Sequence, residues 1–125
     1  MVRVNVTGER VPFSFANWNP EEGWGEFIFM LIGKTIVCLF KLNEGDFIQD
    51  ITCPLGNPTE IEGDKIAVIG GGVGLAVAFP VARTLVAQGK EVHAIMGART
   101  KDLLLLEDQF QIGRASCRER VSSPV

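Results

Sequence analysis

Residues 65–74, KIAVIGGGVG, combine an apolar run with four glycines, Gly70, Gly71, Gly72 and Gly74. The apolar run predicts a buried strand, and the stretch that follows the glycines predicts a helix. A strand that passes through bare glycines into a helix exposes backbone amides at the positive end of the helix dipole, where a phosphate approaches closely. We therefore expect the loop 70–74 to bind the pyrophosphate of a dinucleotide. The alternative is a tight strand-to-helix turn without a ligand.

The spacing of these glycines departs from the G-x-G-x-x-G fingerprint. Leu75 and Val77 stand where a third glycine would follow Gly72 and Gly74. The next predicted strand, EVHAIMG, is followed by Ala98 and Arg99, with no acidic residue to bind the ribose hydroxyls of NAD. Arg99 is a candidate contact for the 2′-phosphate of NADP, and capping of nearby carbonyls is the alternative. NADH and NADPH both stay open.

The first sixty residues contain short β-rich segments bounded by turn residues. These segments are VRVNV, VPFSFANW, WGEFIFMLI and DFIQDITC. One short helix is expected in KTIVCLFKL, between the third and the fourth segment. Several short strands at this spacing predict an antiparallel barrel or sandwich.

The pattern of the sequence changes near residues 60–64, where the short β-rich segments end and strand and helix patterns begin to alternate. From there on the pattern predicts a strand at 65–70, a helix at 75–88, a strand at 91–97 and a helix at 100–110. This order predicts parallel strands joined by a right-handed crossover. We therefore expect part of a β-barrel at 1–60 and the start of a doubly wound α/β module at 61–111.

The segment 112–125 differs from the rest of the chain. It carries three arginines and one glutamate in a chain whose net charge is −3, and it has neither a helical nor an alternating pattern. QIGRASCRERV is also similar to the translation of a widely used sequencing adapter. We predict that 112–125 is a non-native cloning or sequencing tail, the alternative being a natural disordered tail.

Composition excludes several classes of protein. Hydrophobic residues make up 46% of the chain, enough for a packed core, and no apolar run is long enough to cross a membrane. We expect a cytoplasmic protein without a signal peptide, and the acidic balance argues against a nucleic-acid partner. Three unevenly spaced cysteines suggest neither a disulfide framework nor a zinc site. No triad or paired carboxylate indicates acid–base catalysis, and His93 is expected to pack within its strand.

Five motifs together resemble a known family. GGGVGLA and GARTKDLLLLED are similar to the nicotinamide module of the ferredoxin–NADP reductase superfamily. GERVPFSFANWN, GKTIVCLFKLNEGD and PLGNP resemble the flavin barrel of one branch. That branch holds the electron-transfer subunit of dihydroorotate dehydrogenase and the sulfide dehydrogenase-like small subunit of NADH-dependent ferredoxin–NADP oxidoreductase. The resemblance covers about residues 3–110.

The resemblance implies roles for individual residues. Three motifs would contact FAD or lie at the turn between the two modules: Arg10, Pro12 and Ser14; Gly33, Lys34 and Thr35; and Pro54, Leu55 and Gly56. Gly71, Gly72 and Gly74 match the NAD(P) phosphate loop. Val77 departs from the family, which commonly has proline there. A larger departure is that barrel strands before Met1, the later strands of the nicotinamide module and the cysteine-rich extension for a [2Fe-2S] cluster are absent.

The implied function is electron transfer. NAD(P)H would reduce FAD, which would pass electrons through an iron–sulfur centre to a catalytic partner subunit similar to dihydroorotate dehydrogenase or glutamate synthase. None of the three cysteines is assigned to the cluster. A non-catalytic nucleotide-binding or regulatory module is the competing hypothesis, and an inactive gene fragment is a third.

Overall fold

The computed structural model describes residues 1–104, 106, 108–109 and 116–121. Its contacts divide the chain into two compact units. The first unit contains Met1–Phe13 and Phe29–Glu60, and the second contains Ser14–Ile28 and Ile61–Val125. The segment Ser14–Ile28 thus groups with the residues after 60, whereas the sequence analysis placed it with the first module. The division at residue 60 stays a prediction.

In the first unit, strand β1 (Val2–Arg3) pairs antiparallel with β4 (Asp50–Ile51), and Val2 also forms a bridge to Val11. Helix α1 (Lys34–Phe40) lies between them in the chain, where the sequence predicts the short helix. It begins after Gly33, whose φ of 95° favours glycine. Val2 is almost fully buried, so this end of the chain is anchored.

The segment Ser14–Ile28 forms a hairpin in which β2 (Asn17–Asn19) pairs antiparallel with β3 (Trp24–Glu26). The side-chain oxygen of Asn19 accepts hydrogen bonds from the backbone amides of Glu21 and Glu22 at 3.0 and 3.2 Å, which closes the turn. Gly23 completes it with a φ of 73°. Phe15 stacks on Phe27 with ring centroids 4.5 Å apart, on the stem of the same hairpin.

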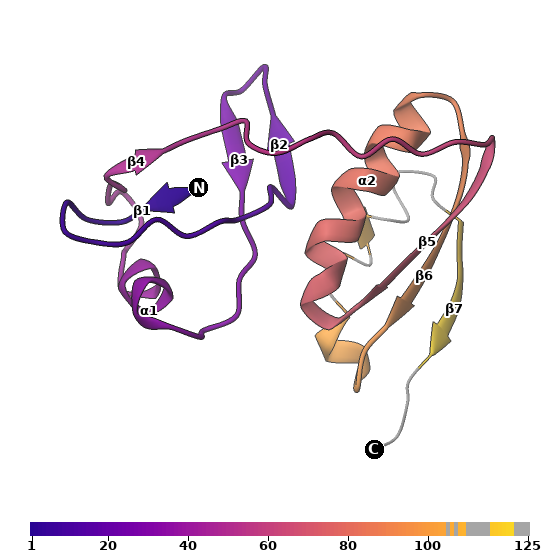
Figure 1. The fold of residues 1–125 in the computed structure, drawn as a ribbon. Coiled ribbons are helices and arrows are strands. Elements are labelled where there is room, and N and C mark those ends of the chain that lie inside the picture. The colour runs from indigo at the N-terminus through magenta and orange to yellow at the C-terminus, as the bar shows by residue number, and fades with distance from the viewer. Residues whose placement is uncertain (105, 107, 110–115, 122–125) are drawn as a thin grey trace. The chain divides into compact units, whose positions relative to one another are not determined.

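The second unit also holds a parallel sheet in the order β5 (Lys65–Gly71), β6 (Glu91–Gly97) and β7 (Ser116–Val121). The first two strands confirm the predicted parallel pair to within one residue. The third strand falls within the segment predicted to be a non-native tail, and that origin stays a prediction. Figure 1 shows the three strands side by side with helix α2 (Leu75–Ala87) against the sheet.

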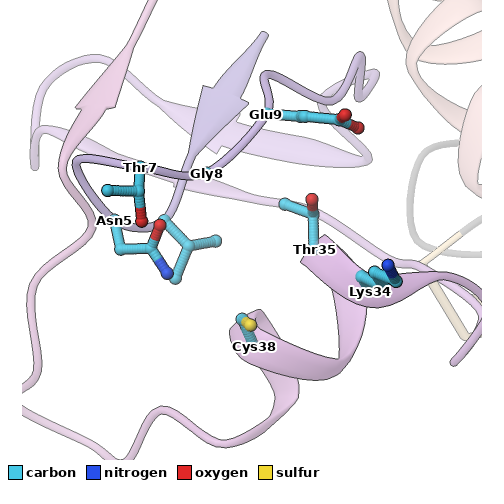
Figure 2. A pocket seen from close by; sticks show the side chains of 8 residues that line it. Asn5, Thr7, Gly8, Glu9, Lys34, Thr35 and Cys38 are labelled. Atoms are coloured by element: carbon cyan, nitrogen blue, oxygen red, sulfur yellow. The ribbon is translucent and has the colours of Figure 1, made fainter.

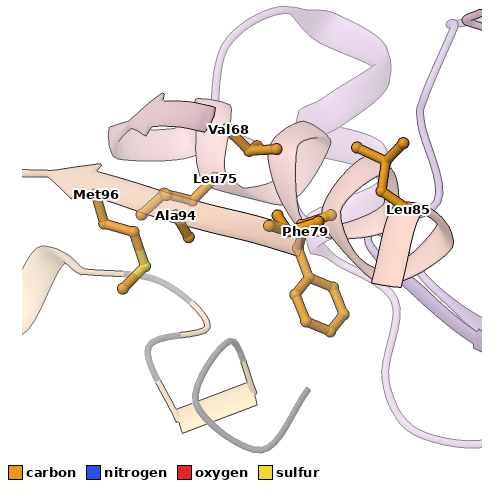
Figure 3. Packing of buried hydrophobic residues seen from close by; sticks show 8 residues of the cluster. Val68, Leu75, Phe79, Leu85, Ala94 and Met96 are labelled. Atoms are coloured by element: carbon orange, nitrogen blue, oxygen red, sulfur yellow. The ribbon is translucent and has the colours of Figure 1, made fainter. Parts of the chain in front are cut away.

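Helix α2 forms because apolar residues recur on one of its faces. Leu75, Ala76, Phe79, Ala82 and Leu85 are buried on that face. All of these except Ala76 form one core cluster with Val68 of β5 and with Val92, Ala94 and Met96 of β6 (Figure 3). The helix ends at a turn in which Gly89, with a φ of 81°, donates its amide to the Val86 carbonyl. Burying Leu75 completely contributes about 1.5–3 kcal/mol to this core.

The described residues form two separate two-stranded antiparallel sheets in the first half of the chain, so the partial barrel expected at 1–60 stays a prediction. One expectation needs correction. The helix expected over 100–110 does not continue: a single 3-10 turn spans Lys101–Leu103, Leu104 is extended, and Leu106 has a φ of 61°. Four consecutive leucines lack the helical alternation of apolar and polar residues, so the pattern supports a helix there only weakly. Residues 105, 107 and 110 of this predicted helix lie outside the described residues.

In the part of the chain that the structure describes, no helix is both long and apolar enough to cross a membrane.

Candidate functional site

The glycine loop lies where β5 passes into α2. Gly72 to Gly74 form one 3-10 turn, and α2 begins at Leu75 without a side-chain cap on its first amides. Gly72 has a φ of 54°, in the left-handed region that favours glycine. A Cβ on Gly72 or Gly74 would meet no atom within 4 Å. The amide of Leu75 donates to the carbonyl oxygens of Gly72 and Val73, and the space beside Gly72 and Gly74 is open, which suits an anion at a helix N-terminus.

Gly70 has a different role from its neighbours. A Cβ there would lie 2.9 Å from Leu75 Cδ2 and 3.1 Å from the Ala78 Cβ. Helix α2 therefore approaches β5 closely because residue 70 has no side chain. The sequence places Gly70 within the predicted phosphate loop, although its position at the end of the predicted strand is also a signal for close packing.

Arg99 follows the end of β6, next to the glycine loop. In the parallel register Gly71 is the partner of Gly97, and a Cβ on Gly71 would lie 3.7 Å from the Gly97 carbonyl oxygen. The carboxyl ends of β5 and β6, and hence the glycine loop and Arg99, share one edge of the sheet. This is the edge at which open α/β sheets bind ligands. Arg99 is exposed and forms no ion pair or hydrogen bond with the described residues.

A cavity of about 260 Å³ lies in the first unit, between the turn at 4–9 and the start of α1 (Figure 2). It brings together two predicted flavin contacts, Lys34 and Thr35. The other residues that line it are Val4, Asn5, Thr7, Gly8, Glu9 and Cys38. The sequence analysis missed the contribution of the 4–9 turn, because a turn that faces a helix thirty residues away has no local signature.

Arg10 lies next to this turn and is held by neighbours on and after β4. Its guanidinium donates to the Thr52 hydroxyl and to Asp50 Oδ2, the latter at 3.4 Å, and lies 3.3 Å from Asp50 Oδ1. Arg3 pairs with the same carboxylate. An arginine has five donors, so these contacts leave Arg10 with capacity for a phosphate, and they fix its orientation.

The remaining predicted site residues are exposed. Pro12 and Ser14 lie on the segment that leads from the Val11 bridge toward β2. Pro54, Leu55 and Gly56 form a turn after β4, and Gly56 has a φ of 85°. The structure therefore collects Lys34 and Thr35 at one cavity, and Gly71, Gly72, Gly74 and Arg99 at one sheet edge, each group within its own unit.

The described residues contain no cluster of three or more metal-ligating side chains, and Cys38 and Cys53 are free thiols. They offer no ligand set for an iron–sulfur cluster; the side chain of Cys117 lies outside the description. His93 does not pack within its strand as expected. It is part-exposed and its Nε2 lies 2.9 Å from Glu91 Oε1. That hydrogen bond, followed by Lys65, lowers the pKa of Glu91 from its ordinary value.

Comparisons with known proteins agree with the resemblance. A Thermotoga maritima protein described as a homolog of the electron transfer subunit of dihydroorotate dehydrogenase B (NAD(+)) is 41% identical over 112 residues, which is 89% of this chain and 40% of that protein. The electron transfer subunit of dihydroorotate dehydrogenase B (NAD(+)) from Streptococcus mutans is 32% identical over 105 residues, 81% of this chain and 40% of its own length. The chain thus spans about 40% of the length of these curated relatives. No family model matches the sequence.

A solved structure gives the same result. It is reported as an NADH-dependent reduced ferredoxin–NADP oxidoreductase that informs flavin-based electron bifurcation. It superposes with a TM-score of 0.86 and 37% identity, covering 98% of this chain and 45% of that one. The chain therefore belongs to the ferredoxin–NADP reductase-like family of oxidoreductases that includes the electron transfer subunits of dihydroorotate dehydrogenase B and of this oxidoreductase.

Proposed function

We propose that the chain is a segment of an FAD-dependent electron-transfer subunit that takes electrons from NAD(P)H and passes them to a catalytic partner subunit. The observation that carries this proposal is the loop Gly72–Gly74. There, no side chain caps the start of a thirteen-residue helix, and a Cβ on Gly72 or Gly74 would meet no atom within 4 Å. This arrangement fits the pyrophosphate of a dinucleotide.

The nucleotide half of the site works through the backbone. The amides at the start of α2 donate to the pyrophosphate, and the left-handed Gly72 turns the chain so that the loop stays clear of side chains. Arg99, at the end of the neighbouring strand, supplies positive charge to a ribose or its 2′-phosphate. The dinucleotide contributes the hydride chemistry when it is bound.

The residues proposed to contact the flavin phosphates belong to the first unit. Lys34 and Thr35, at the lining of the 260 Å³ cavity, supply an ammonium and a hydroxyl that suit a phosphate. Arg10 is held at a fixed orientation by Asp50 and Thr52 and keeps donors for a second phosphate oxygen. The family resemblance implies that Pro12 and Ser14 would run along the flavin ring and that Pro54–Gly56 would form the turn between the flavin and nicotinamide modules.

The proposal also involves groups that we assign to the full-length protein containing this segment, which we call the parent. A [2Fe-2S] cluster, a closed flavin barrel and the surface for a dihydroorotate dehydrogenase-like or glutamate synthase-like partner belong to this proposal. The described residues of the chain supply no cluster ligands, so no step through a cluster is derived from them.

The test is a Gly72→Asp variant of the parent. A side chain at this left-handed position strains the loop, and its carboxylate repels the pyrophosphate. We expect the KM for NAD(P)H to rise at least tenfold while FAD content stays unchanged. An unaltered KM would remove the assignment of the loop. A parent that purifies without flavin would favour a nucleotide-binding or regulatory module without redox activity.

A further inference from the structure

Helix α2 and the β2–β3 hairpin are joined by one exposed arginine. Arg83, on α2, donates from Nη1 to the Asn17 side-chain oxygen at 2.7 Å and to the Trp18 carbonyl at 2.9 Å. Its guanidinium carbon lies 4.6 Å from the centroid of the Trp18 ring. A single side chain therefore makes two hydrogen bonds and a cation–π contact with one strand of the hairpin.

The acceptor side of this contact is pre-organised. Asn17 Oδ1 also accepts the backbone amide of Trp18 at 3.0 Å, which fixes the orientation of the amide group. Asn17 Nδ2 donates in turn to Gln109 Oε1 at 3.3 Å. Arg83 thus meets two oxygens and an aromatic face that are already held in place.

Each partner of the contact is continuous with a predicted cofactor segment. Ser14, of the flavin motif, precedes Asn17 by three residues, and between them Ala16 is fully buried and donates its amide to the Glu26 carbonyl at 2.8 Å. On the other side, Arg83 lies eight residues after Leu75, about 12 Å along the helix from the glycine loop. Arg83 therefore connects the segment that contains Ser14, through the β2 strand, to the glycine loop, through helix α2.

We propose that Arg83 is a positioning residue that fixes the β2–β3 hairpin, and with it the flavin-contacting Ser14, relative to the helix that carries the pyrophosphate loop. The proposal rests on the proposed function. Hydride transfer requires the two rings to be held in contact, and a displacement of about 1 Å costs up to about a hundredfold in rate. Loss of Arg83 would therefore affect the reaction more than the binding of either cofactor.

The experiment compares Arg83→Ala, Arg83→Lys, Trp18→Leu and the Arg83→Ala/Trp18→Leu double variant in the parent. Lys65→Ala is the charge-matched control, because Lys65 is an exposed cation at the opposite end of β5. Rapid mixing gives the rate constant of flavin reduction at saturating NAD(P)H, and titration gives the dissociation constant of the dinucleotide. Hydrogen–deuterium exchange of residues 14–26 in the flavin-free protein reports the hairpin without any activity.

We expect Arg83→Ala to slow flavin reduction about tenfold or more, with FAD content and dinucleotide affinity within about twofold, and to speed exchange of the hairpin. Arg83→Lys should restore part of the rate, because an ammonium can donate to the same two oxygens but lacks the planar stack. The double variant should be no slower than Arg83→Ala, since Arg83→Ala already removes the cation–π contact that Trp18→Leu would remove.

Unchanged reduction and exchange in Arg83→Ala would overturn the proposal, and so would a loss of FAD that accounts for the slower reaction. If the parent itself binds no flavin, the proposed function fails. The exchange measurement still decides whether Arg83 holds the hairpin.

Discussion

Gly74→Ala separates the binding of a nucleotide from the stability of the glycine loop. Gly74 has φ and ψ of −61° and −20°, which alanine adopts without strain, and its Cβ would meet no atom within 4 Å. The substitution should therefore stabilise the protein by about 0.4–1 kcal/mol, because it restricts the unfolded chain. The added methyl enters the open space at the start of α2, where the phosphate is proposed to bind. We expect it to weaken phosphate contacts worth about 1.5–3 kcal/mol.

That loss corresponds to an increase of about tenfold to a hundredfold in the dissociation constant for NAD(P)H. The matched variant is Gly70→Ala, whose Cβ would lie 2.9 Å from Leu75 Cδ2 in the helix–strand contact. It should lower stability by about 1–3 kcal/mol and leave dinucleotide affinity nearly unchanged in the folded protein. Thermal unfolding and fluorescence titration of the parent measure both quantities. Gly74→Ala with unchanged affinity, or with lower stability, would refute this reasoning.

Three further outcomes are expected. Arg10→Ala should remove a charge-assisted hydrogen bond, worth about 1.5–3 kcal/mol, between the protein and a flavin phosphate, so that FAD dissociates on dialysis. If the protein stays yellow, Arg10 binds only Asp50 and Thr52 and not the flavin. His93 and Lys65 lower the pKa of Glu91. The ionised Glu91 side chain therefore makes a small contribution to the stability of the folded protein at pH values above 4.5, the ordinary pKa, and this contribution is lost as the pH falls through the lowered pKa. Melting temperatures of Glu91→Gln and the unchanged protein should thus converge at low pH, and a gap that widens there would contradict the assignment. The 125-residue chain, purified with FAD, should not sustain NAD(P)H oxidation with an artificial acceptor, because its described residues form no closed barrel; stoichiometric flavin with turnover would contradict this.

The parts of the fold that the sequence predicts well are those with a strong local pattern. The strand at 65–71 contains a continuous apolar run, the strand at 91–97 is mostly apolar, and the helix between them has a clear apolar face. In the first half, the predicted strand at 11–18 shortens to Asn17–Asn19 and the one at 46–53 to Asp50–Ile51. Their extent depends on partners distant in the chain, which a local pattern does not encode.

The same distinction applies to the candidate site. The glycine loop is local, and the structure has the predicted strand, turn and helix. The cavity beside Lys34 and the contact of Arg83 with Trp18 join residues about thirty and sixty-five positions apart. Arg83 in the sequence is one charged residue on the polar face of a helix, and only the fold places it over an aromatic ring.

The glycine spacing that departs from the dinucleotide fingerprint has a physical explanation in this fold. The third glycine of G-x-G-x-x-G allows close packing of the helix on the strand. Here Leu75, the first residue of α2, is completely buried, and Gly70 on the strand leaves the room for it. The residue without a side chain that allows close packing is thus on the strand, at Gly70, and not on the helix. Gly72 adopts the left-handed conformation of the turn, and Gly74 leaves open space at the start of the helix. A loop that fails the fingerprint by spacing therefore still meets each of its three physical requirements, which is why the proposal of a phosphate site does not depend on the spacing.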